Sequence, residues 1–223
     1  DVYKRQIETM ATPIHEAEES RIRKVYAARS ESVDYSWLNP SYVFTIQALE
    51  KRMLAALGQA RIHLPDSRIL EIGCGKGYWL RRLAEWGAPP EKMVGIDLLP
   101  DRVAAARRLS PASMELRCQS AAQLPSADHA FDLVLQVTVF TSILDMPLKR
   151  QIAGEMLRVL KPGGHILWYD FCFNNPRNPN VRGIGRGEIA SLFPDCKIAL
   201  RRVTLAPPIA RKLTSRAWLL CEL

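Results

Sequence analysis

The residues with the clearest chemical potential are three alternating glycines that follow a short apolar segment. Residues 69–72 read Ile-Leu-Glu-Ile, and Gly73, Cys74, Gly75 and Gly77 follow them. Glycine lets the backbone turn tightly and approach a ligand closely, and the N–H groups at the start of a helix favour anionic or polar ligands. A tight strand-to-helix turn that binds nothing is the alternative. Three alternating glycines make that alternative the less favoured one, so the pattern predicts a ligand site.

The spacing of the glycines separates two classes of ligand. A dinucleotide fingerprint reads G-x-G-x-x-G or G-x-G-x-x-A, and counted from Gly73 its third small residue would stand where the chain has Tyr78. Asp97 ends the next apolar segment, where a carboxylate can accept hydrogen bonds from both hydroxyls of a ribose. Capping of the following helix is the alternative for this aspartate, but Pro100 or Asp101 gives a better start signal for that helix. The sequence therefore favours a nucleoside-containing ligand and disfavours a nicotinamide-dependent oxidoreductase.

The G-x-G-x-G spacing, preceded by an acid on the strand, resembles motif I of the class I S-adenosylmethionine-dependent methyltransferases. Asp97, residues 131–134 (Phe-Asp-Leu-Val) and residues 157–164 are similar to later segments of the same family, which extends the resemblance over about residues 66–171. The resemblance implies a doubly wound, mostly parallel α/β sheet. It also implies S-adenosyl-L-methionine as cofactor and S-adenosyl-L-homocysteine as product. We expect residues 61–223 to form the cofactor-binding part and residues 1–60 a helical cap or lid within the same domain.

The resemblance also implies roles for individual residues. Glu71 would help to place the ammonium group of the methionine part, and the backbone carbonyl of Gln136 would offer it an acceptor. Members of the family often place an acid after the third strand, where it meets the adenine amino group, but this chain has Ser120 there. The expected cofactor-binding residues are Glu71, Gly73, Cys74, Gly75, Gly77, Asp97, Leu98, Ser120, Ala121 and Gln136.

Alternating apolar and helix-type segments must position these residues. Near-continuous apolar runs separated by helices indicate a parallel sheet covered on both faces. Strands are expected at 69–72, 93–97, 114–118, 131–136 and 165–171, with a further strand at 197–205. Helices are expected at 78–86, 100–109 and 148–160, a turn at 161–164, and another helix from Pro40 to about Leu57, stopped by Gly58.

The composition limits the class of protein and the kinds of partner that the chain could have. The chain is 48% hydrophobic and 24% charged, as an ordinary globular protein is. Its longest uncharged apolar run, residues 133–144, is too short to span a bilayer. The five cysteines form no C-x-x-C pair, so neither a metal site nor a disulfide framework is indicated, and a cytoplasmic location is expected. Residues 174–223 hold nine of the Lys and Arg against three acids. That excess is either a surface that attracts anionic partners or a solvated basic face, and we favour the second.

The segment after the fourth strand limits the classes of methyl acceptor that the chain could use. It reads Gln-Val-Thr-Val over 136–139, without the Asn-Pro-Pro-Tyr, Asp-Pro-Pro-Tyr or Pro-Cys sequences of nucleic acid or glutamine methylation and without the acid of a magnesium-dependent catechol enzyme. We therefore expect a bacterial enzyme with a small-molecule acceptor, an oxygen nucleophile and no nucleic acid partner. A cofactor-binding module that has lost catalysis and serves a partner remains the alternative.

A base is needed only if the acceptor loses a proton as it attacks. Asp170, Tyr169 and Tyr35 are the candidates. Residues 26–42 are aromatic-rich and are expected to act as a lid over the acceptor, or else as an amphipathic cap on the sheet. The expected substrate-binding residues are Tyr26, Arg29, Tyr35, Asn39, Asn174, Asn175 and Arg182.

Neither end of the chain is expected to be the natural one. Residues 1–6 resemble translated sequencing adapter, and Met10 is an alternative start. Residues 217–223 lack the alternation and β-branching of a strand. We therefore expect the last antiparallel strand of the family's sheet to be missing.

Overall fold

The structure is a computed structural model that describes residues 2–28, 36–176 and 178–204, with side chains from residue 15 onward. The chain divides into two compact units. Of the described residues, one unit holds 2–26, 63–176 and 178–198, and the other holds 27–28, 36–62 and 199–204. The first helix, up to Tyr26, falls in the same unit as the sheet, and the division predicted near residue 60 stays a prediction.

A five-stranded parallel sheet forms the centre of the first unit, in the order β3-β2-β1-β4-β5. The strands are β1 (Ile69–Ile72), β2 (Met93–Asp97), β3 (Glu115–Cys118), β4 (Phe131–Val137) and β5 (Leu160–Tyr169). All residues of β1 and β2 are buried, as strands covered on both faces must be. The order reverses between β1 and β4, and in open α/β sheets such a switch point is where ligands bind. The expected doubly wound fold is confirmed.

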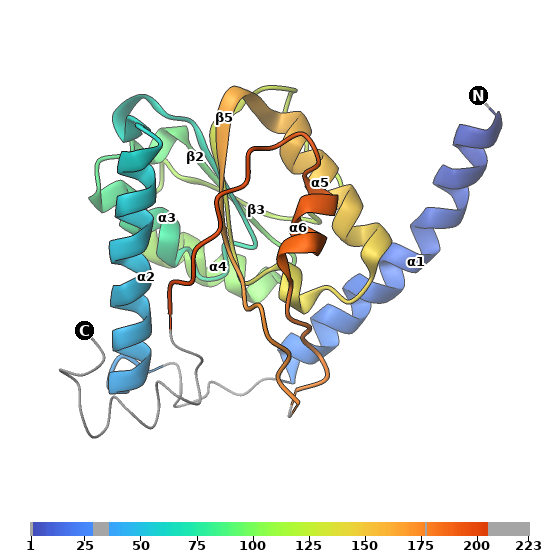
Figure 1. Cartoon of the computed structure of the whole chain (residues 1–223), viewed down its shortest axis with the longest axis horizontal. Coiled ribbons are helices and arrows are strands. Elements are labelled where there is room, and N and C mark those ends of the chain that lie inside the picture. Colours follow the sequence, from blue (N-terminus) through green and yellow to red (C-terminus); the bar gives the residue numbers. More distant parts are fainter. Residues whose placement is uncertain (1, 29–35, 177, 205–223) are drawn as a thin grey trace. The chain divides into compact units, whose positions relative to one another are not determined.

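Helices cover both faces of this sheet (Figure 1). The helices α3 (Tyr78–Glu85) and α4 (Pro100–Leu109) cover one face, while α5 (Met146–Val159) and α6 (Arg186–Leu192) cover the other. The main hydrophobic core lies between the sheet and α5, where Leu70, Val134 and Met156 are at most 1% exposed. Helix α1 (Val2–Ala27) joins this unit up to Tyr26. In the second unit, α2 (Pro40–Gln59) begins at an N-cap formed by Asn39, whose side chain accepts from the Ser41 N–H.

Several sequence expectations are corrected. Residues 197–204 form no strand, because they make none of the ladder hydrogen bonds that define one. The expected turn at 161–164 is part of β5, where a register shift opposite Phe131 and Leu133 and a left-handed Gly163 form a bulge. Gly58 lies inside α2 instead of ending it. The predictions for residues 217–223 and for Leu205 concern residues that the structure does not describe. The side chains of residues 1–6 are not described either.

Candidate cofactor site

The glycine loop after β1 adopts a backbone that other residues would strain. Gly73, Gly75 and Gly77 all have φ between 55° and 74°. A Cβ on Gly73 would stand 2.4 Å from Cγ2 of Val139, so this backbone approaches the loop after β4 closely. Gly77 caps the N-terminus of α3 and aims the first turn of that helix at the carboxyl end of the sheet. The loop therefore leaves an open backbone surface where a ligand can lie.

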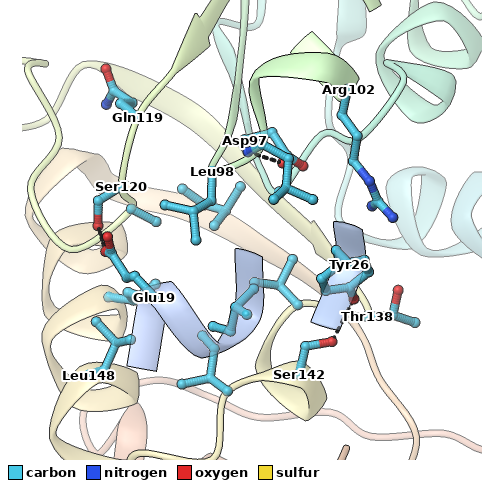
Figure 2. Close-up of a pocket in the computed structure, with 18 of the residues that line it drawn as sticks. Glu19, Tyr26, Asp97, Leu98, Arg102, Gln119, Ser120, Thr138, Ser142 and Leu148 are labelled. Carbon is cyan, nitrogen blue, oxygen red and sulfur yellow. Dashed lines mark hydrogen bonds between the residues drawn. The ribbon is translucent and has the colours of Figure 1, made fainter. Parts of the chain in front are cut away.

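A pocket lies above the carboxyl ends of four strands at the switch point, and Figure 2 shows its lining. It has about 740 Å³ of empty space, part of which is open to solvent. Each strand contributes from the loop that follows it: Gly73 after β1, Leu98 after β2, Ser120 and Ala121 after β3, and Thr138 after β4. Helix α1 contributes Glu19, Ile22 and Tyr26.

Asp97 is held in a fixed orientation at the end of β2. It is 7% exposed and lines the pocket. One carboxylate oxygen accepts from the backbone N–H of Gly75 at 2.8 Å, and the other accepts from that of Leu99 at 2.9 Å. Each oxygen keeps a further lone pair, so the carboxylate can accept hydrogen bonds from two neighbouring hydroxyls. This geometry fits the ribose contact expected of Asp97.

Glu71 lies beneath the pocket, in the middle of the sheet. It is 1% exposed, and its Oε2 has no hydrogen-bond partner among the described residues. Burial, followed by repulsion from Asp97, raises the pKa of this carboxyl to about 8. A buried acceptor without a donor fits a ligand that carries an ammonium group. Together with Gly73 and Asp97, this orphaned oxygen makes the site chemically suited to S-adenosylmethionine.

Gln136 and Asp170 form a buried cluster that holds the loop after β4. Gln136 donates to Asp170 at 3.0 Å and accepts from the Val139 N–H at 3.1 Å. Thr141 donates its hydroxyl to Asp170 at 2.6 Å. Burial raises the pKa of Asp170 to about 6, against the lowering effect of these hydrogen bonds. Neither Gln136 nor Asp170 lines the pocket, so the structure places both as supports of the lining, and Tyr169 lies on β5 with its carbonyl bonded to Thr138.

Thr138 is one of the described non-glycine residues with a left-handed backbone, at φ 59°. It follows β4 directly and lines the pocket. Left-handed backbone at a residue with a side chain persists only where its surroundings hold it. Here the N–H of Thr138 donates to the carbonyl of Tyr169 at 2.7 Å, which fixes the turn toward the pocket.

Helix α1 closes one side of the pocket through contacts that the sequence does not reveal. Arg21 donates to the carbonyl of Ser142 at 2.7 Å, and Glu18 accepts from Arg21 and from the N–H of Leu144. Arg23 donates to the carbonyl of Leu98 at 2.6 Å. Because the partners lie about a hundred residues away in the chain, only the folded structure brings these groups together.

The expected substrate-binding residues separate into three groups. Tyr26 lines the pocket, where its hydroxyl bonds with that of Ser142 and the guanidinium of Arg102 lies 4.4 Å from its ring centroid. The others in the described chain lie outside the pocket lining: Asn39, Asn174, Asn175 and Arg182. Asn174 accepts from the N–H of Gly183, and Arg182 pairs with Glu188. Arg29 and Tyr35 lie outside the described residues, as does most of the expected lid.

The cofactor residues expected from the sequence are also divided. Gly73, Asp97, Leu98, Ser120 and Ala121 line the pocket. The remaining members are not among the lining residues: Glu71, Cys74, Gly75, Gly77 and Gln136. Sequence reasoning missed Glu19, Ile22, Arg102, Val137, Val139 and Ser142. The position of Arg102 in the first turn after Asp97 is a signal that could have identified it.

The fold and the pocket define a Rossmann-like protein that binds a nucleoside-containing cofactor. Residues 69–164 match the family model described as a methyltransferase domain. This part of the chain is therefore similar to a methyltransferase domain, and S-adenosylmethionine is the cofactor that the match and the site indicate. Gly73, Asp97 and the loop at Ser120 would hold that cofactor, which supplies a methyl group on a sulfonium.

Curated relatives include a demethylmenaquinone methyltransferase of Listeria monocytogenes, 27% identical over 172 residues, which is 75% of this chain and 67% of the relative. A demethylmenaquinone methyltransferase of Bacillus cereus is 30% identical over 129 residues, or 56% of this chain and 51% of the relative. The chain thus spans from half to two thirds of these relatives. A solved S-adenosylmethionine-dependent methyltransferase from Methanosarcina mazei is 23% identical with a TM-score of 0.53, covering 61% of this chain and 81% of its own, and it shows the shared fold.

The described residues hold neither a membrane-spanning helix nor a metal-binding cluster. No helix in that part of the chain is both long and apolar enough to cross a membrane. No three His, Cys, Asp or Glu side chains gather there in a way that could hold a metal ion.

Proposed function

We propose that the protein transfers the methyl group of S-adenosylmethionine to a small aromatic molecule that attacks through an oxygen atom. The observation that carries the proposal is the pocket at the switch point, in which apolar and aromatic side chains adjoin the glycine loop. Val137, Val139 and Ile143 line it together with Tyr26. Such a lining favours a flat apolar acceptor. The names of the curated relatives, which refer to demethylmenaquinone, support an acceptor of the quinone type. They do not support oxygen as the attacking atom, because the methyl group that demethylmenaquinone lacks is on a ring carbon.

The pocket supplies positioning rather than a strong base. Its ionisable lining residues in the described chain are Glu19, Tyr26, Asp97 and Arg102. The hydroxyl of Tyr26 is bonded to Ser142, and Asp97 is bonded to two backbone N–H groups. The sulfonium supplies an activated methyl whose leaving group departs neutral, so the protein must chiefly bind, orient and exclude water.

Arg102 gives the proposal an electrostatic basis. Its guanidinium lies over the Tyr26 ring at 4.4 Å from the centroid and close to the glycine loop, 3.9 Å from where a Cβ of Gly75 would stand. A cation in this position favours the ionised form of an acidic hydroxyl, such as a phenol or hydroquinone. An acceptor that ionises readily needs no dedicated base.

The test is a screen of hydroxylated aromatic acceptors, including a short-chain demethylmenaquinone in its reduced form, for release of S-adenosylhomocysteine. Mass spectrometry and NMR of the product locate the new methyl group. We expect turnover with methyl on oxygen, and Arg102→Met should lower kcat/KM by about tenfold or more if one charge-assisted contact is lost. Binding of S-adenosylhomocysteine without turnover on any acceptor would instead support the silent cofactor-binding module, and methyl found on carbon would contradict the oxygen assignment.

A further inference from the structure

The order of the strands fixes the order in which a ligand meets the pocket lining. Along the carboxyl edge β3, β2, β1 and β4 stand side by side, about 4.8 Å apart, and they present Ser120, Asp97, Gly73 and Thr138 in turn. Figure 2 shows Ser120, Asp97 and Thr138 in this order from one side of the pocket to the other, with Glu19 beside Ser120 and Tyr26 beside Thr138. With the ribose at Asp97 and the methionine part at Gly73, the base must lie at the side of Ser120.

The base side of the pocket combines apolar side chains with the polar side chains of Glu19, Gln119 and Ser120. Leu98, Ala121 and Leu148 line it, and flat rings pack well on such side chains. Adenine also carries an exocyclic amino group, which only donates hydrogen bonds and needs an acceptor when it is buried. Glu19 brings a carboxylate to this end from helix α1, and 18% of its side chain is exposed.

The hydroxyl proton of Ser120 is already engaged in a hydrogen bond. Its hydroxyl donates to Oε1 of Glu19 and accepts from the N–H of Ala122 at 3.0 Å. A serine that spends its proton in this way holds the carboxylate in place. The carboxylate itself keeps several lone pairs, since two oxygens offer about four acceptor sites. Among these groups, Glu19 is therefore the strongest acceptor for an amino group.

Helix α1 holds Glu19 at this position from both sides. Arg23 lies 3.7 Å from the second carboxylate oxygen and donates to the carbonyl of Leu98, a residue of the pocket lining. Glu18, the preceding residue, accepts from the N–H of Leu144 at the other side of the helix. These contacts place the Glu19 side chain over the loop after β3 whenever α1 is docked.

We propose that Glu19 accepts a hydrogen bond from the adenine C6 amino group of the cofactor, and that Ser120 is a positioning residue for Glu19. The carboxylate that the sequence lacks after β3 is thus supplied by α1. The consequence is that docking of α1 completes the adenine site, so cofactor binding and closure of α1 favour each other. This inference rests on S-adenosylmethionine binding in this pocket and adds to the proposed methyl transfer.

The experiment measures binding by titration calorimetry, with no turnover involved. The ligands are S-adenosylhomocysteine and its analogue in which hydrogen replaces the C6 amino group. The wild-type protein should bind S-adenosylhomocysteine about tenfold tighter than the analogue, as expected for one hydrogen bond to a charged group. Glu19→Ala should bind both ligands with nearly equal affinity, and Glu19→Gln, which keeps a carbonyl acceptor, should retain part of the preference.

Glu16→Ala is the matched control, because Glu16 is an exposed carboxylate on the same helix and should keep the wild-type preference. An equal loss of affinity for both ligands in Glu19→Ala would overturn the proposal, since Glu19 would then act only through the docking of α1. An unchanged preference in both Glu19 variants would overturn it as well. If the wild-type protein binds neither ligand, the assignment of the pocket itself fails, and the proposed function fails with it.

Discussion

Replacing Glu71 by glutamine is expected to remove a pH dependence of stability that this buried carboxyl imposes on the protein. The side chain is 1% exposed within the sheet, and burial raises its pKa from 4.5 to about 8. At neutral pH the folded protein therefore holds a protonated Glu71, whereas the unfolded chain holds an ionised one. Glutamine is a neutral side chain of the same size and reproduces the protonated form.

The sign and the magnitude follow from these two pKa values. A raised pKa means that the contribution of Glu71 to stability is fully present below the unfolded value of 4.5 and is lost as pH rises through the folded value of about 8. Each pH unit inside this window lowers the free energy of unfolding by about 1.4 kcal/mol. From about pH 5 to about pH 8, the stability of the wild-type protein should fall by about 3 kcal/mol relative to that of Glu71→Gln.

The assay is urea unfolding of the ligand-free protein across this pH range, followed by circular dichroism. Glu85→Gln, which removes an exposed carboxylate from α3, is the matched control and should remain parallel to the wild-type curve. If Glu71→Gln also remains parallel to the wild type, Glu71 is ionised in the folded protein and the reasoning is refuted. A related measurement is proton release on binding of S-adenosylhomocysteine at neutral pH, which should occur in the wild type and be absent from the variant.

Three further changes test the site and its supports. Asp97→Ala should weaken S-adenosylhomocysteine binding by about 1.5–3 kcal/mol, because it removes charge-assisted hydrogen bonds; unchanged affinity by calorimetry would remove Asp97 from the site. Gly73→Ala should destabilise the protein and weaken cofactor binding, because the new Cβ would meet Cγ2 of Val139 at 2.4 Å, and Val139→Ala in the same chain should restore part of the loss by thermal unfolding. Thr141→Val should lower the free energy of unfolding by about 1–3 kcal/mol, since Asp170 then loses a buried hydrogen bond, and an unchanged urea midpoint would contradict that role.

The sheet could be predicted from the sequence because its signal is local. Residues 69–72 and 93–97 are apolar runs between turn residues, and the structure has strands with the same bounds. A strand buried on both faces must be apolar at nearly every position, so its pattern does not depend on which neighbour it pairs with. The position of Asp97 at the pocket could be predicted too. A predicted strand also fixes its own carboxyl end, and ligands bind at the carboxyl ends of the strands in open α/β sheets.

Other features could not be predicted from the sequence, because they depend on contacts between distant parts of the chain. Residues 197–204 have the composition of a strand, but a strand exists only through hydrogen bonds to a neighbour, and the described chain forms none there. The side chain of Gln136 near the end of β4 is bonded to Asp170, while the contact predicted for its backbone carbonyl stays a prediction. Asn174 lies in an amide-rich loop that it closes by accepting from Gly183, and its contact with substrate also stays a prediction.

Helix α1 is the clearest example of functional residues that the local sequence pattern does not indicate. Glu18, Glu19 and Arg21 form a run of charges that reads as a solvated helix face, yet all three bond to groups that surround the pocket or its loops. Residues that line a pocket from outside the motifs must be carried there by docking, and docking energy comes from side chains spaced one helical turn apart, such as Ile22 and Tyr26. Docking of α1 is therefore part of building the cofactor site, and the hydrogen bonds of Arg21 and Glu18 hold the helix there.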